Sequence, residues 1–140
     1  MNNILSPDAN GIVREKYLRS ALTEEIRKSK LNGYIPANAS NHHIDGGKPE
    51  EYAEYFLSII KKTTKINANY NQIVRSYSST GLLKEVKRLG LFSINPQTSP
   101  GIDPKNLNDP LINIKEGVRL YSILIRKENN LPQVNGVVFI

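Results

Sequence analysis

The segment from Pro96 to Pro110 constrains the fold more than any other part of this sequence. It contains four prolines, at positions 96, 100, 104 and 110, together with Gly101. Each proline fixes its own φ and restricts the residue before it, so this composition indicates a stiff, ordered loop rather than a flexible linker. Gly90, shortly before this segment, is typical of the glycine that ends a helix in the left-handed backbone conformation. Asp109-Pro110 is typical of a helix start, and we expect a helix from about Leu111 to Asn129.

Apolar side chains recur at helical spacing in four further segments. The predicted helices cover residues 12–31, about 50–66, about 70–78 and 82–89. In the second, Tyr52, Tyr55, Phe56, Ile59 and Ile60 form a stripe typical of a core-facing helix. The 70–78 helix is inferred from Tyr70, Ile73, Val74 and Tyr77, and the 82–89 helix from Leu82, Leu83, Val86 and Leu89. The predicted fold class is therefore mainly α, with an N-terminal helical arm and long ordered loops.

A chain of 140 residues is long enough for one domain with an additional arm. We place the arm, its helix and a Gly- and Asn-rich loop at 1–48, and the main domain at 49–140. The net charge of +6 comes from basic side chains spread along the chain, without a run of five like charges. This favours a solvated surface with a basic bias; attraction to an anionic polymer such as cell wall or nucleic acid is the alternative.

The composition argues against several kinds of functional site and against several cellular locations. There is no cysteine, which excludes disulfides and cysteine metal sites. The N-terminal residues lack the pattern of a signal peptide, and no apolar run approaches the ~18 residues of a membrane span. His42, His43 and Asp45 are weak candidates for metal binding, because adjacent histidines rarely converge on one ion. A polar loop is the preferred interpretation, and we expect no metal or other cofactor.

The last four residues, Val137, Val138, Phe139 and Ile140, are all apolar. Such a segment needs to be covered by the chain's own core or by a partner. We therefore expect the C-terminal tail, and also the N-terminal arm, to contact other protein subunits.

Three segments in order resemble the lytic transglycosylase branch of the lysozyme superfamily. They are QIVRSYS at 72–78, GLFSINP at 90–96, and LNDPLINIKEGVRLY at 107–121. They are similar to the family's aliphatic run ending in Glu-Ser, its Gly-Leu-Met-Gln segment, and its Asp-Pro-x-x-Asn-Ile helix start. The resemblance covers roughly residues 50–128. It implies a lysozyme-like helical domain, truncated at its C-terminal end, that is related to enzymes cutting peptidoglycan glycan strands.

The resemblance also implies that catalytic groups are missing. The family's acid falls on Tyr77, and a phenol is a poor proton donor beside a carboxylic acid tuned for this chemistry. The family's glutamine falls on Ser93. Glu85 is a weak substitute acid, and Tyr77 is interpreted as a buried aromatic residue that fills the space of the lost acid. The expected vestigial groove contains Tyr77, Ser78, Gly90, Leu91, Phe92, Ser93 and Asn95.

The sequence therefore predicts a non-catalytic structural or interaction protein, which the family resemblance places in a phage virion, as a component of the tail, baseplate or injection apparatus. An active transglycosylase or muramidase is one alternative, and a peptidoglycan-binding module is another. Peptidoglycan is a conceivable partner, whereas contact with a membrane or with nucleic acid is not expected.

Overall fold

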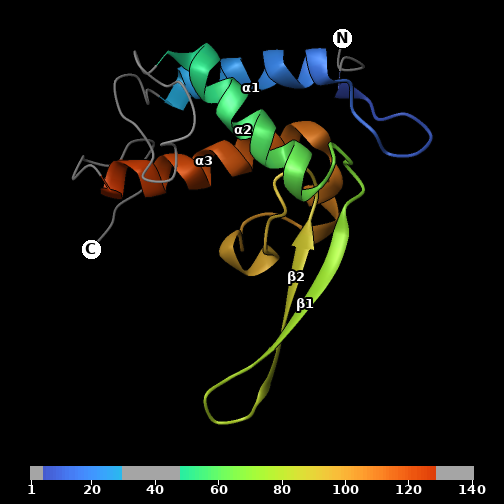
Figure 1. Ribbon diagram of the computed structural model, residues 1–140, viewed down its shortest axis with the longest axis vertical. Coiled ribbons are helices and arrows are strands. Elements are labelled where there is room, and N and C mark those ends of the chain that lie inside the picture. Colours follow the sequence, from blue (N-terminus) through green and yellow to red (C-terminus); the bar gives the residue numbers. More distant parts are fainter. Residues whose placement is uncertain (1–4, 30–47, 129–140) are drawn as a thin grey trace.

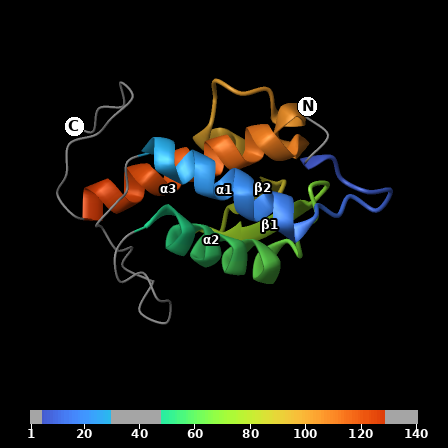
Figure 2. The same cartoon turned by 90° about the horizontal axis from the view of Figure 1, so that it is seen from above.

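The computed structural model describes residues 5–29 and 48–128, and its main body is formed by three helices. These are α1 (Glu15–Ser29), α2 (Pro49–Thr63) and α3 (Pro110–Glu128). Helix α1 packs against both α2 and α3, as the view from above shows (Figure 2). The bounds of α1 and α3 lie within three residues of those expected, because apolar periodicity and end signals agree in both segments.

An antiparallel β-hairpin projects from this helical body along the longest axis of the molecule (Figure 1). Its strands are β1 (Asn71–Tyr77) and β2 (Leu83–Leu89), paired from Asn71 with Leu89 to Tyr77 with Leu83. The 3-10 helices η2 (Pro96–Thr98) and η3 (Pro104–Asn108) follow within the proline-rich segment. Two short helices therefore give this loop the ordered path that its prolines predict.

The predicted helices at 70–78 and 82–89 are wrong, since these residues form the two strands of the hairpin. Among the described residues, 54% are helical and 16% are in strands, so this is a mixed α/β small domain rather than a mainly α one. The four apolar residues assigned to the first of these helices include Ile73, Val74 and Tyr77, which also favour extended backbone. The second segment, rich in helix-forming residues, is held as a strand by pairing with the first, so a tertiary contact overrides local propensity.

One hydrophobic core joins the three helices. Leu18, Leu22 and Ile26 of α1 are fully buried in the same cluster as Tyr52 and Phe56 of α2. Helix α1 is therefore a structural part of the main body. The expected domain boundary at residue 48 is next to residues that lie outside the described ranges. A second, smaller cluster of Leu89, Ile94 and Leu107 fixes the base of the hairpin to the proline-rich segment.

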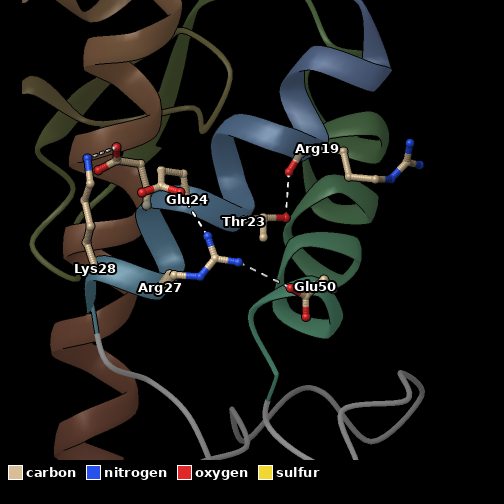
Figure 3. Close-up of polar contacts among 7 residues, drawn as sticks. Arg19, Thr23, Glu24, Arg27, Lys28 and Glu50 are labelled. Atoms are coloured by element: carbon tan, nitrogen blue, oxygen red, sulfur yellow. Dashed lines mark hydrogen bonds and ion pairs between the residues drawn. The ribbon is translucent and has the colours of Figure 1, made fainter.

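Charged side chains on the outer surface also connect α1 with α2 (Figure 3). Arg27 donates to Glu24 on its own helix at 2.9 Å and reaches Glu50 of α2 at 3.5 Å. Arg19 pairs with Glu54 of α2 and with Glu15 on its own helix. These pairs are well exposed, so each contributes at most about 1 kcal/mol, and burial of the apolar stripe remains the main stabilising term.

Candidate functional site

The buried side-chain amide of Asn113 bonds to three backbone groups in and around the turn at residues 90–95. Its Nδ2 donates to the carbonyl oxygens of Leu89 at 3.0 Å and Leu107 at 2.7 Å, and its Oδ1 accepts from Phe92 N at 2.7 Å. Gly90 has a φ of +74°, and a Cβ there would lie 2.1 Å from Asn113 Nδ2. A glycine is needed at this position because both the backbone conformation and the close approach exclude a side chain.

Aromatic packing holds the same turn on α3. A Cβ on Gly117 would lie 2.2 Å from the Phe92 ring, so this glycine makes room for Phe92. The rings of Phe92, Tyr121 and Phe56 contact one another, with centroids 4.9 to 5.8 Å apart. The two motif segments 90–96 and 107–121 are thus brought into direct contact.

Ser93 and Asn95 have the roles expected of loop residues. Ser93 has a φ of +53° within the turn, and Ser93 N donates to Gly90 O. The Asn95 side chain accepts from Gln97 N at 3.0 Å and so caps η2. Ser93 is therefore a turn residue, and the Asn95 side chain is a partner of the loop backbone.

Tyr77 and Ser78 lie at the far end of the hairpin, away from this turn. Six pairs separate Tyr77 from the base of the hairpin, which corresponds to about 20 Å at the usual rise of a strand. Tyr77 is 75% exposed, so the interpretation of this residue as a buried aromatic is wrong. The structure brings together Gly90, Leu91, Phe92, Ser93 and Asn95 of the expected groove, and separates Tyr77 and Ser78 from them.

Thr64, which directly follows α2, also contacts the turn, and no sequence motif pointed to it. Thr64 is 3% exposed, and its Oγ1 lies 2.9 Å from Leu91 O and 3.1 Å from Ile60 O. Lys65 and Ile66, which follow, both have positive φ and turn the chain away from the helix. A hydroxyl bonded to carbonyl oxygens joins α2 to the turn, but it is a very weak acid and cannot serve as a proton donor in glycan cleavage.

An open groove of about 390 Å³ lies between the hairpin and the proline-rich segment. Its lining residues are Ile73, Glu85, Lys87, Asn95, Pro96, Gln97 and Pro104. Glu85 is its one carboxylate among the described residues. This side chain is half-exposed and accepts from Arg75 Nε at 2.8 Å. Its surroundings differ from the apolar pocket that keeps a catalytic carboxylic acid protonated.

A second carboxylate, Glu116 of α3, is buried behind the loop. Arg119 Nε donates to Glu116 Oε1 at 2.8 Å, and the Ser99 hydroxyl donates to Glu116 Oε2. Burial by itself raises the pKa of Glu116, but the hydrogen bonds from Arg119 and Ser99 outweigh it and the pKa is lowered. The pKa of Arg119 is raised by its bond to Glu116. This group is therefore an ionised brace between α3 and the loop at Ser99.

The remaining predicted sites lie outside the described residues. These are the metal candidates His42, His43 and Asp45, and the apolar tail Val137, Val138, Phe139 and Ile140. Within residues 5–29 and 48–128, there is no cluster of three or more histidine, aspartate or glutamate side chains that could hold a metal ion. No helix in those ranges is long and apolar enough to cross a membrane.

Comparison of the chain with protein-family models, with curated proteins and with solved structures gave no match.

Proposed function

We propose that this chain is a non-catalytic structural or interaction protein related to the transglycosylases, and that it belongs to a phage virion as a component of the tail, baseplate or injection apparatus. The proposed relation is supported by the contact between segments 90–96 and 107–121, where Gly90 lies against Asn113 and Phe92 lies against Gly117. The assignment to a virion is an extension of the family resemblance.

The observation that carries the non-catalytic assignment is the state of the groove carboxylate. Glycan cleavage needs a group that protonates the glycosidic oxygen, and such a group is a carboxylic acid kept neutral by apolar surroundings. Glu85 is instead ion-paired with Arg75 and open to water. Tyr77, on which the family's acid falls, is an exposed phenol at the hairpin tip.

A glycan-release assay tests this proposal. The purified full chain is incubated with dye-labelled peptidoglycan beside a known muramidase, and we expect no release above the buffer control. Glu85→Gln should behave as the wild type does. Release by the wild-type chain that Glu85→Gln abolishes would overturn the non-catalytic assignment and identify an active enzyme. Release that persists in Glu85→Gln would also overturn it, with the acid then located elsewhere.

A peptidoglycan-binding module is the second candidate, and the composition of the groove favours it. Asn95, Gln97 and Lys87 offer hydrogen-bond groups beside the apolar faces of Ile73 and Pro96, a combination suited to sugars. Retention on insoluble peptidoglycan, lost in Gln97→Ala, would support binding in the groove. Tyr77→Ala is the matched control, because Tyr77 lies at the hairpin tip outside the groove.

The proposed contacts with other subunits involve the N-terminal arm and the C-terminal tail. Deleting residues 1–31 would not test them, because Leu18, Leu22 and Ile26 of α1 fill the core. Replacing Val137, Val138, Phe139 and Ile140 by serine is the better experiment. Loss of incorporation into particles with an unchanged melting temperature supports the proposal, and normal incorporation argues against a role of the tail.

A further inference from the structure

We propose that the tip of the β-hairpin binds an anionic membrane surface. This inference goes beyond the proposed function and does not depend on the groove. It begins with the exposed apolar side chains. The hairpin tip, defined here as Tyr77, Leu82 and Leu83, holds three large apolar side chains that are 75%, 70% and 52% exposed. Burying groups of this size away from water is strongly favourable, so their exposure indicates a binding surface.

The distribution of these side chains sets the hairpin apart from the rest of the protein. Within the described residues, seven large apolar side chains are exposed, and five of them lie on the hairpin. The other two, Leu111 and Leu124, are isolated on α3. Figure 1 shows that the hairpin extends well beyond the helical body, so its tip can reach a flat surface without a clash from the helices.

Charge identifies the nature of that surface. Between Asn71 and Leu89 there are four cationic side chains and one carboxylate, so the hairpin carries +3 of the net charge of +6. Glu85 is neutralised by Arg75. Within the described part of the chain, Lys84 and Lys87 have no ion-pair partner and are exposed. The complementary partner is therefore anionic.

The order of side chains along β2 matches the layers of a membrane interface. Leu82 and Leu83 come first, Lys84 follows directly, and Lys87 and Arg88 lie about 13 to 17 Å behind Leu83 at the usual strand rise. Apolar groups of peripheral proteins enter roughly 5 to 10 Å into the boundary between headgroups and acyl chains. Long cationic side chains then extend to the lipid phosphates, and tyrosine favours the same interfacial depth.

Other anionic or apolar partners fit this arrangement less well. If the hairpin bound a nucleic acid, its tip would need cations to contact the phosphates. The tip instead holds Tyr77, Leu82 and Leu83, which would lie against the phosphates. A second copy of the hairpin would bring like charges together, which is unfavourable. This proposal departs from the sequence-based expectation that the protein does not contact a membrane.

The base of the hairpin is firm enough to carry such a contact. Gly90 N donates to Tyr70 O at 2.8 Å, and the Asn108 amide donates to the carbonyl oxygens of Ala68 and Tyr70. At the tip, Ser78 N donates to Leu82 O, and Gly81 has the positive φ that closes the loop. Substitutions of tip side chains should therefore leave the helical core folded.

Vesicle co-sedimentation tests the proposal. The full chain is mixed in 0.1 M salt with phosphatidylglycerol/phosphatidylcholine vesicles or with phosphatidylcholine vesicles alone. We expect binding to the anionic vesicles only, weakened by salt. Leu82→Ser/Leu83→Ser should weaken binding by at least about tenfold. Lys84→Gln/Lys87→Gln should weaken it by about fivefold for each lysine. Leu111→Ser and Lys62→Gln/Lys127→Gln are the matched controls and should bind as the wild type does.

A tryptophan at the tip reports insertion directly. The chain has no tryptophan, so Tyr77→Trp gives a single probe. Its emission should shift to the blue with anionic vesicles, and brominated lipids should quench it. The proposal is overturned by absent binding, by equal binding to neutral vesicles, or by unchanged binding of Leu82→Ser/Leu83→Ser. It is also overturned if binding to a DNA duplex or self-association, and not vesicle binding, is lost in that variant.

Discussion

Individual side chains hold the loop region together through buried polar contacts rather than through apolar packing alone. Asn113 is completely buried and satisfies three backbone groups from three different segments. The Glu116 carboxylate accepts hydrogen bonds from Ser99 and Arg119. Asn113 and Glu116 both lie within the motif segment 107–121, but the sequence motif does not show which backbone atoms the side-chain amide of Asn113 contacts. The partners of Asn113 are 6 to 24 residues away in sequence.

Replacing Asn113 by alanine should destabilise the protein by about 2 to 6 kcal/mol. The substitution removes the side-chain partner of Phe92 N and of Leu107 O, whereas Leu89 O keeps the bond from Ile94 N, and each of the two unpaired groups costs roughly 1 to 3 kcal/mol. Urea unfolding followed by circular dichroism measures the change. The exposed Asn106→Ala on η3 is the control and should change stability by less than about 0.5 kcal/mol. Equal stability of the two variants would contradict the role given to Asn113.

The Glu116 brace predicts a dependence of stability on pH. The folded pKa of Glu116 lies below its ordinary value of 4.5. The contribution of the carboxylate is therefore fully present above about pH 4.5 and is lost as the pH falls through the folded pKa. The free energy of unfolding should fall more steeply below this pH in the wild type than in Glu116→Gln. Glu24→Gln, at an exposed position of α1, is the control. Parallel curves for the wild type and Glu116→Gln would refute the prediction.

In the hairpin, pairing between the two strands determines the secondary structure more than the residues of each strand do. Two seven-residue segments flank Ser78-Ser79-Thr80-Gly81-Leu82, and Gly81 has a φ of +82°. The equal lengths and the central glycine are a hairpin signal, which the helical spacing of Val74, Tyr77, Val86 and Leu89 obscured. Cross-strand pairs such as Val74 with Val86 and Arg75 with Glu85 then stabilise the strands.

Gly81→Ala should loosen the hairpin without affecting the helices. No atom obstructs a Cβ at this site, so only the left-handed backbone is unfavourable, by roughly 1 kcal/mol. Amide hydrogen exchange should become about fivefold faster in β1 and β2 and stay unchanged in the buried turns of α2 and α3. Ser79→Ala is the control in the same loop. A large fall in the melting temperature would show instead that the hairpin is part of the cooperative core.

At the scale of the whole molecule, one core unites helices that the sequence analysis assigned to two regions. Helix α1 packs on α2 and α3, while the hairpin projects away from the helices (Figure 1). Half of the net charge lies on the hairpin.

Leu22→Ala should destabilise the entire protein by about 2 to 5 kcal/mol, because this fully buried side chain leaves a cavity between the helices. Near-ultraviolet circular dichroism, which reports the tyrosines, and far-ultraviolet circular dichroism should show the same shifted transition. The exposed Lys16→Ala on the same helix is the control. Separate transitions would mean that α1 folds independently of the main body.

The sequence by itself determined the three helices and the ordered proline-rich segment, because apolar periodicity, end signals and proline geometry are local properties that do not depend on distant residues. It also predicted the turn at Gly90, whose conformation requires a residue without a side chain. The hairpin at residues 71–89, the exposed position of Tyr77 at its tip and the contact of Thr64 with Leu91 are visible only in the folded protein. Each of these outcomes depends on contacts between segments distant in the chain, for which the free energy of pairing and burial exceeds the preferences of the individual residues.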